Sequence, residues 1–252
     1  MNKNLLKILA LLTAIGAISI NALAVILPFN NRSTADISNS FNAALVPANY
    51  VFSIWGLIYL GLIAFPVYQF IKKEEDFEKV NSLFILSNIA NATWIYLWHY
   101  GHYKLCLVVM LILLACLIGI YSKLEIGIKK VKKLREIMVN AVFSLYLGWI
   151  TVATVANAED TLISSGFEGF GVQPRIWAVL LIIIITVITC SFIYYRKDAV
   201  YVGVIIWALF GVFIKSFNEK LIAYSALIAC LILLGYIIDV KVLSTEKFLK
   251  KK

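Results

Sequence analysis

The sequence predicts an all-α protein, a polytopic membrane bundle of about eight transmembrane helices. Three observations support this fold class. The 252-residue chain is 62% hydrophobic and only 15% charged, whereas soluble domains are roughly half apolar. Its apolar residues form eight runs that reach or approach the roughly 20 residues needed to cross a bilayer core. Its charged residues lie in short tracts between these runs.

The eight spans are placed near residues 5–28, 49–71, 81–100, 104–122, 137–158, 175–196, 199–215 and 221–239. The seventh is the shortest. The first begins with a lysine-bearing segment and contains Ala-Leu-Ala at 22–24, a pattern that also fits a cleaved signal peptide. Because the apolar run continues to Pro28, we favour a retained first helix.

The net charge of the chain is +9, and the distribution of its basic residues indicates how the protein is oriented in a membrane. Eighteen of the 23 Lys and Arg residues fall on the side of the N-terminus if the spans alternate in direction. Cytoplasmic loops carry such an excess, so we expect both termini in the cytoplasm and a multi-pass protein of a bacterial cytoplasmic membrane. The basic residues do not gather on one face, so we expect no nucleic-acid partner.

Acidic residues and metal-ligating residues give no sign of catalysis. All 14 Asp and Glu lie in loops, tails or at a span end. Ionisable groups at membrane depth usually mark proton or ion pathways, so we expect neither an ion-coupled transporter nor catalytic residues. His99 and His102 could begin a metal site, but no carboxylate or cysteine accompanies them. We expect no metal and no required cofactor.

Polar and aromatic side chains recur at helical spacing in three spans, which places each set largely on one helix face. The sets are Phe52, Trp55 and Tyr59 in the second span, Asn88, Asn91, Trp94 and Trp98 in the third, and Tyr146, Trp149, Ala153 and Asn157 in the fifth. Such amides also form plain helix–helix hydrogen bonds, and such aromatics also form interfacial belts. Ligand pockets combine aromatic walls with a few polar groups, so a shared pocket is the alternative interpretation.

These stretches resemble three motifs of the TspO/MBR family, the tryptophan-rich sensory and translocator proteins. Its second-helix motif is similar to PANYVFSIWGLIY at 47–59, its third-helix motif to NATW at 91–94, and its fifth-helix motif to YLGWITVATVAN at 146–157. The resemblance covers roughly residues 5–158. It implies a TspO/MBR-like five-helix bundle at 1–158, to which 159–252 add three transmembrane helices and a basic cytoplasmic tail.

The resemblance also implies a ligand and a site. The ligand would be a tetrapyrrole, such as porphyrin or haem, or another flat hydrophobic molecule. The implied ligand-binding residues are Trp55, Tyr59, Asn91, Trp94, Trp149 and Ala153, with Phe52, Asn88, Trp98 and Tyr146 as secondary candidates. The leading hypothesis is a sensor or receptor. The alternatives are a carrier of uncharged hydrophobic compounds and a light-dependent porphyrin-degrading enzyme. A homodimer stays open.

Overall fold

The computed structural model describes residues 3–27, 29–41, 43–72, 77–167 and 169–249, with side chains as far as 239. Its long helices are α1 (Lys3–Ile26), α3 (Ile54–Ile71), α4 (Glu78–His99), α5 (Tyr103–Lys123), α7 (Ala141–Ser164), α8 (Pro174–Arg196), α9 (Ala199–Lys215) and α10 (Lys220–Leu249). The short ones are η1 (Phe29–Asn31), α2 (Thr34–Asn39), η2 (Asn49–Ser53), α6 (Lys133–Arg135), η3 (Glu136–Asn140) and η4 (Gly169–Gly171).

Each of the eight predicted spans coincides with one long helix, so the predicted fold class is confirmed. The eighth span differs most, because the sequence placed its end near residue 239, whereas α10 continues to Leu249. The fifth span differs next most at its end. The sequence placed its end near residue 158, whereas α7 continues to Ser164. Pro28, the expected end of the first span, lies outside the described residues, as do the side chains of the basic tail.

Six helical segments within the described residues are long and apolar enough to cross a membrane. α9 is too short by this measure, with 17 residues. α4 is not among the six segments. It is long enough, about 33 Å at the usual helical rise, but it is more polar, and it buries Asn81, Asn88 and Asn91. Its polar groups therefore face other helices of the bundle and not the surrounding hydrocarbon.

Five helices form a closed ring. α1 packs against α3 and α4, α4 packs against α5, and α7 completes the ring by packing against both α3 and α5. One end of the interior is filled by Phe65, whose ring contacts Phe77, Phe84 and Phe143 edge-on with centroids 4.9–5.6 Å apart. Such aromatic pairs bury large apolar areas, so this end of the ring is closed.

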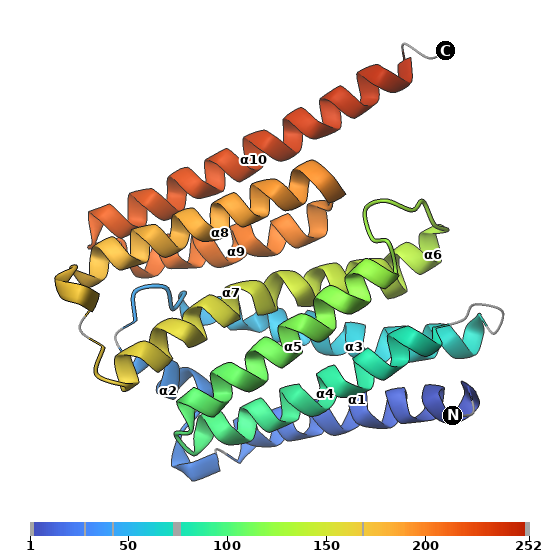
Figure 1. The fold of residues 1–252 in the computed structure, drawn as a ribbon, viewed down its shortest axis with the longest axis horizontal. Helices are drawn as coiled ribbons and strands as arrows, with labels where there is room; N and C mark the ends of the chain where they lie inside the picture. The colour runs from blue at the N-terminus through green and yellow to red at the C-terminus, as the bar shows by residue number, and fades with distance from the viewer. Residues whose placement is uncertain (1–2, 28, 42, 73–76, 168, 250–252) are drawn as a thin grey trace.

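The last three long helices form a second layer over one side of the ring (Figure 1). α8, α9 and α10 pack against one another, and α9 packs against α7. Polar contacts link the layers, because Tyr121 Oη donates to Asp198 Oδ2 at 2.8 Å and Tyr201 Oη to Thr151 Oγ1 at 3.3 Å. The expected division after residue 158 therefore falls within α7, the ring helix that also packs against α9 of the second layer.

The beginning of α1 and the end of α10 lie at the same end of the bundle (Figure 1). An even number of crossings requires this arrangement. α6 and the basic segment before it lie at that end too, while α2 lies at the opposite end. Figure 1 thus separates a basic end, with the beginning of α1 and the end of α10, from an end with the long α1–α3 connection.

Candidate functional site

A small cavity of about 60 Å³ lies within the ring, beneath α2. Its walls come from α2, the segment after α2, α3, α4, α5 and α7. They are formed by Thr34, Ser38, Val46, Pro47, Phe52, Trp55, Trp94, Trp98, Met110, Trp149, Val152, Ala153, Ala156, Asn157 and Asp160. Four indoles and a phenyl ring thus dominate a largely apolar lining.

The aromatic rings of the lining contact one another across helices. Trp149 meets Trp55 edge-on at 6.1 Å between ring centroids, and meets Phe52 in the same way at 5.8 Å. On the other wall, Trp94 and Trp98 stack at 5.3 Å with an interplanar angle of 19°. Edge-on and stacked pairs are the favoured arrangements of such rings, so this cluster is a packed, pre-formed surface.

The structure brings six of the ten predicted site residues together in the lining. These are Phe52, Trp55, Trp94, Trp98, Trp149 and Ala153. The indoles of Trp55 and Trp149 face inward, as a shared pocket requires, so the interfacial-belt interpretation does not describe them. Their role in binding stays a prediction.

The other four predicted residues lie behind the lining. Asn91 accepts a hydrogen bond from Asn21 Nδ2 at 2.7 Å and donates one to Tyr146 Oη at 3.1 Å. Asn88 Nδ2 donates to Thr13 Oγ1 at 3.3 Å. Tyr59 stacks on Trp55 at 5.6 Å. Buried amides lower their free energy by pairing, and here they pair with other helices.

α2 closes the cavity from above. Ser33 begins the helix with a reciprocal capping box, in which Asp36 N donates to Ser33 Oγ and Ser33 N donates to the Asp36 carboxylate. Hydrogen bonds from Ser33 hold the pKa of Asp36 below its usual value. α4 fixes α2 from below, because Trp98 Nε1 donates to Thr34 O at 3.3 Å.

His99 provides a second support for the same segment. Its ring nitrogens lie 3.0 Å from Phe29 O and 3.1 Å from Thr34 Oγ1. The side chain is 2% exposed, whereas that of His102 is exposed. Both ring nitrogens of His99 are engaged in holding the α1–α3 connection.

The segment between α2 and α3 is held from two sides. Glu159 of α7 accepts hydrogen bonds from Ala44 N at 3.0 Å and Leu45 N at 3.1 Å. α9 contributes Gly211 O, which accepts from Ala48 N at 3.1 Å, and Trp207 Nε1, which donates to Val51 O at 3.2 Å. The cover of the cavity therefore depends on α9 as well as on the ring.

Asp160 is a lining residue that the sequence analysis missed. The acidic residues were expected outside the interior, but α7 continues beyond the predicted end of its span, and Asp160 is only 2% exposed. The expectation that no carboxylate reaches the interior is therefore wrong. The helical register offered a signal, since Trp149, Ala153, Asn157 and Asp160 follow steps of four, four and three and so share one face.

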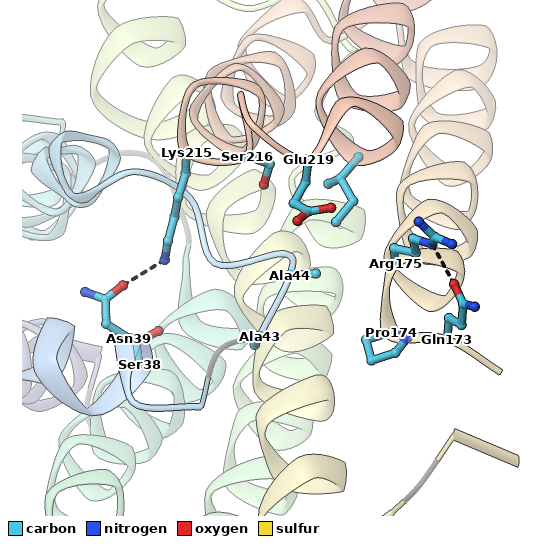
Figure 2. A pocket seen from close by; sticks show the side chains of 11 residues that line it. Ser38, Asn39, Ala43, Ala44, Gln173, Pro174, Arg175, Lys215, Ser216 and Glu219 are labelled. Atoms are coloured by element: carbon cyan, nitrogen blue, oxygen red, sulfur yellow. Dashed lines mark hydrogen bonds between the residues drawn. The ribbon is translucent and has the colours of Figure 1, made fainter. Parts of the chain in front are cut away.

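A larger, polar hollow of about 590 Å³ adjoins the outer side of this cover. It lies between the α2 segment and the ends of α8, α9 and α10. Figure 2 shows Lys215 reaching across to Asn39, with Nζ 2.7 Å from Oδ1, and Arg175 on the far wall beside Gln173. Ser38 lines both this hollow and the aromatic cavity, so the two are neighbours.

Comparison with known proteins gives one match. A family model described as "TSPO-like protein" matches residues 7–238 and so extends through α8, α9 and most of α10. No curated protein and no solved structure shows significant similarity to the chain. The match and the six long apolar segments identify an integral, multi-pass membrane protein.

Proposed function

Because the chain belongs to the TSPO-like protein family, we propose that it is a membrane receptor for a flat, largely apolar small molecule, which binds between its tryptophans. One observation carries this proposal. Trp55, Trp94 and Trp149, from three different helices, line one cavity. Indole faces bind flat apolar rings well, and mainly aromatic walls with few polar groups are typical of small-molecule sites.

The cavity must widen to accept such a ligand. Its volume of about 60 Å³ is well below the ~300–1,000 Å³ of typical ligand pockets. We propose that the part that moves is the cover, which consists of α2 and the segment between α2 and α3. Hydrogen bonds hold this cover to α4, α7 and α9. Displacing it would join the cavity to the adjoining hollow of about 590 Å³. We therefore propose entry of the ligand through this hollow.

Tetrapyrroles such as porphyrin and haem are the first ligands to test, as the sequence resemblance implies. We further propose that the basic end with both termini faces the cytoplasm, by the positive-inside rule. The hollow and the cover would then face outward. A bacterial cytoplasmic membrane remains the proposed location, and a homodimer remains open.

Titration of the purified protein with protoporphyrin in the dark tests the proposal. We expect saturable quenching of tryptophan fluorescence in the wild type. In Ala153→Leu, three added carbon atoms at the wall of a cavity of about 60 Å³ should fill the space and weaken binding at least about tenfold. Ala158→Leu changes the same helix outside the lining and should bind as the wild type does. Equal affinity in all three proteins contradicts this site.

The same preparation distinguishes the alternatives. Loss of porphyrin on illumination, absent in Trp55→Phe and Trp149→Phe, would indicate a photochemical enzyme. Ligand flux into liposomes above that of empty vesicles would indicate a carrier. Binding with neither porphyrin loss nor flux is the result expected of a receptor.

A further inference from the structure

Three buried polar atoms of α7 have no hydrogen-bond partner among the described residues: Trp149 Nε1, Asn157 Nδ2 and Asp160 Oδ1. Their residues are 3%, 3% and 2% exposed, and all three line the aromatic cavity. The lining thus offers two unused donors and, about 4.5 Å further along the helix from Asn157, one unused carboxyl acceptor.

A buried polar atom without a partner costs free energy, and a buried carboxylate costs more. The charged neighbours of Asp160 do not offset the free-energy cost of burying its carboxylate. Lys215 attracts it electrostatically, but the Lys215 ammonium donates to Asn39 Oδ1. Glu159 adds a repulsive charge beside it and is itself engaged by the backbone of Ala44 and Leu45.

We propose that Asp160 is the anchor for a protonated amine on the ligand. The inference rests on the proposed function and narrows its ligand to a flat apolar body with a cationic nitrogen at one end. The ammonium supplies the missing hydrogen-bond donor and the opposite charge together, and such charge-assisted bonds are the strong ones. An acceptor within the apolar body complements Asn157 Nδ2 and Trp149 Nε1.

The same geometry disfavours an anionic group at this position, because two carboxylates at close range repel each other. A porphyrin would have to bind with its carboxylate side chains turned away from Asp160. The outer hollow, with Lys215 and Arg175 in its walls, is the place that would accept them.

Three probes of nearly equal size test this inference: para-nitrobenzylamine, para-nitrobenzyl alcohol and para-nitrobenzoate. The nitrophenyl ring quenches tryptophan fluorescence, so each dissociation constant can be measured at neutral pH. We expect the wild type to bind the amine at least about tenfold tighter than the alcohol, and the benzoate most weakly. Asp160→Asn should still give saturable quenching with the alcohol but lose the preference for the amine.

The alcohol also serves as the folding control, since retained binding shows that Asp160→Asn leaves the cavity intact. Glu219→Gln is the matched charge control. It removes a carboxylate from the outer hollow and should keep the preference for the amine.

The outcomes separate the two proposals. If no probe and no protoporphyrin gives saturable quenching, the proposed function fails and this inference with it. If protoporphyrin binds but no probe does, the receptor stands and the Asp160 anchor is overturned. If amine and alcohol bind equally, a receptor for flat ligands stands but the Asp160 anchor is overturned. Tightest binding of the benzoate, or an amine preference that survives in Asp160→Asn, overturns the anchor as well.

Discussion

At the scale of single residues, the buried amides of α4 divide between structure and site. Sequence spacing placed Asn88 and Asn91 on one face, and the family resemblance implied contact with a ligand. The structure shows that Asn91 instead joins α1 to α7 through Asn21 and Tyr146. Tyr146 in turn contacts the Trp55 ring edge-on at 6.2 Å. Asn91 therefore supports the lining from behind.

We expect Asn91→Leu to lower the stability of the folded protein, with a smaller effect on the free energy of ligand binding. The substitution removes the interhelical acceptor of Asn21 Nδ2, which keeps only its bond to Ala17 O within α1, and it removes the donor to Tyr146 Oη. In membrane proteins, such interhelical hydrogen bonds contribute about 0.6–1.7 kcal/mol, so the melting temperature in detergent should fall. Thr93→Val is the control, because Thr93 is exposed on the same helix and its hydroxyl group donates to the Ile89 carbonyl of that helix. Equal melting temperatures for both variants would contradict this role.

At the scale of elements, α9 lies outside the five-helix ring but within the range of the family match. α9 lies close to the α2–α3 segment because Gly211 has no side chain. A Cβ there would meet Val51 Cγ2 and would lie 3.0 Å from Pro47 Cβ. Close approach lets Gly211 O accept from Ala48 N and lets Trp207 reach Val51 O. α9 thus braces the cover of the cavity.

Gly211→Ala should therefore loosen the cover. The added methyl group displaces Val51 and Pro47, so we expect faster amide exchange over residues 43–53 and a lower melting temperature. Gly203→Ala provides a control on the same helix, since a Cβ at Gly203 meets nothing within 4 Å. There alanine should stabilise the helix by about 0.5–1 kcal/mol. Unchanged exchange in Gly211→Ala would show that α9 does not brace the cover.

At the scale of the whole molecule, the distribution of basic residues and the arrangement of the helices indicate the same orientation in the membrane. The beginning of α1, the end of α10 and the basic α5–α6 segment lie at one end of the bundle, which is the end that charge counting assigns to the cytoplasm. The aromatic cavity and the polar hollow lie toward the other end. In the proposed orientation, a ligand arriving from outside the cell would meet the hollow first.

Cysteine labelling with a membrane-impermeant maleimide on intact cells tests this orientation. Ser165 directly follows the end of α7, and Lys129 lies in the segment between α5 and α6; both are exposed. The end of α7 and the α5–α6 segment lie at opposite ends of the bundle. We expect Ser165→Cys to label in intact cells, and Lys129→Cys only after permeabilisation. The unmodified protein is the background control, because three of its four cysteines are buried and the fourth is half-buried. The reverse pattern would invert the proposed topology.

The sequence by itself determined the helices. Hydrophobic length and the basic tracts predicted all eight long helices, most bounds to within three residues, because crossing a bilayer requires long apolar runs regardless of how they pack. Helical register grouped Trp55, Trp94, Trp149 and Ala153 on helix faces, and the family resemblance assigned them to a site. All four line the cavity.

Only the tertiary structure decided which polar groups pair and which stay unused. Register places an amide on a face, but its partner comes from another helix, so Asn91 proved to contact Asn21, 70 residues away. In the same way, the length of α7 beyond the apolar run and the closure of α2 above it placed Asp160 inside the cavity. Contacts between distant segments depend on packing in three dimensions, which the periodicity of one helix does not contain.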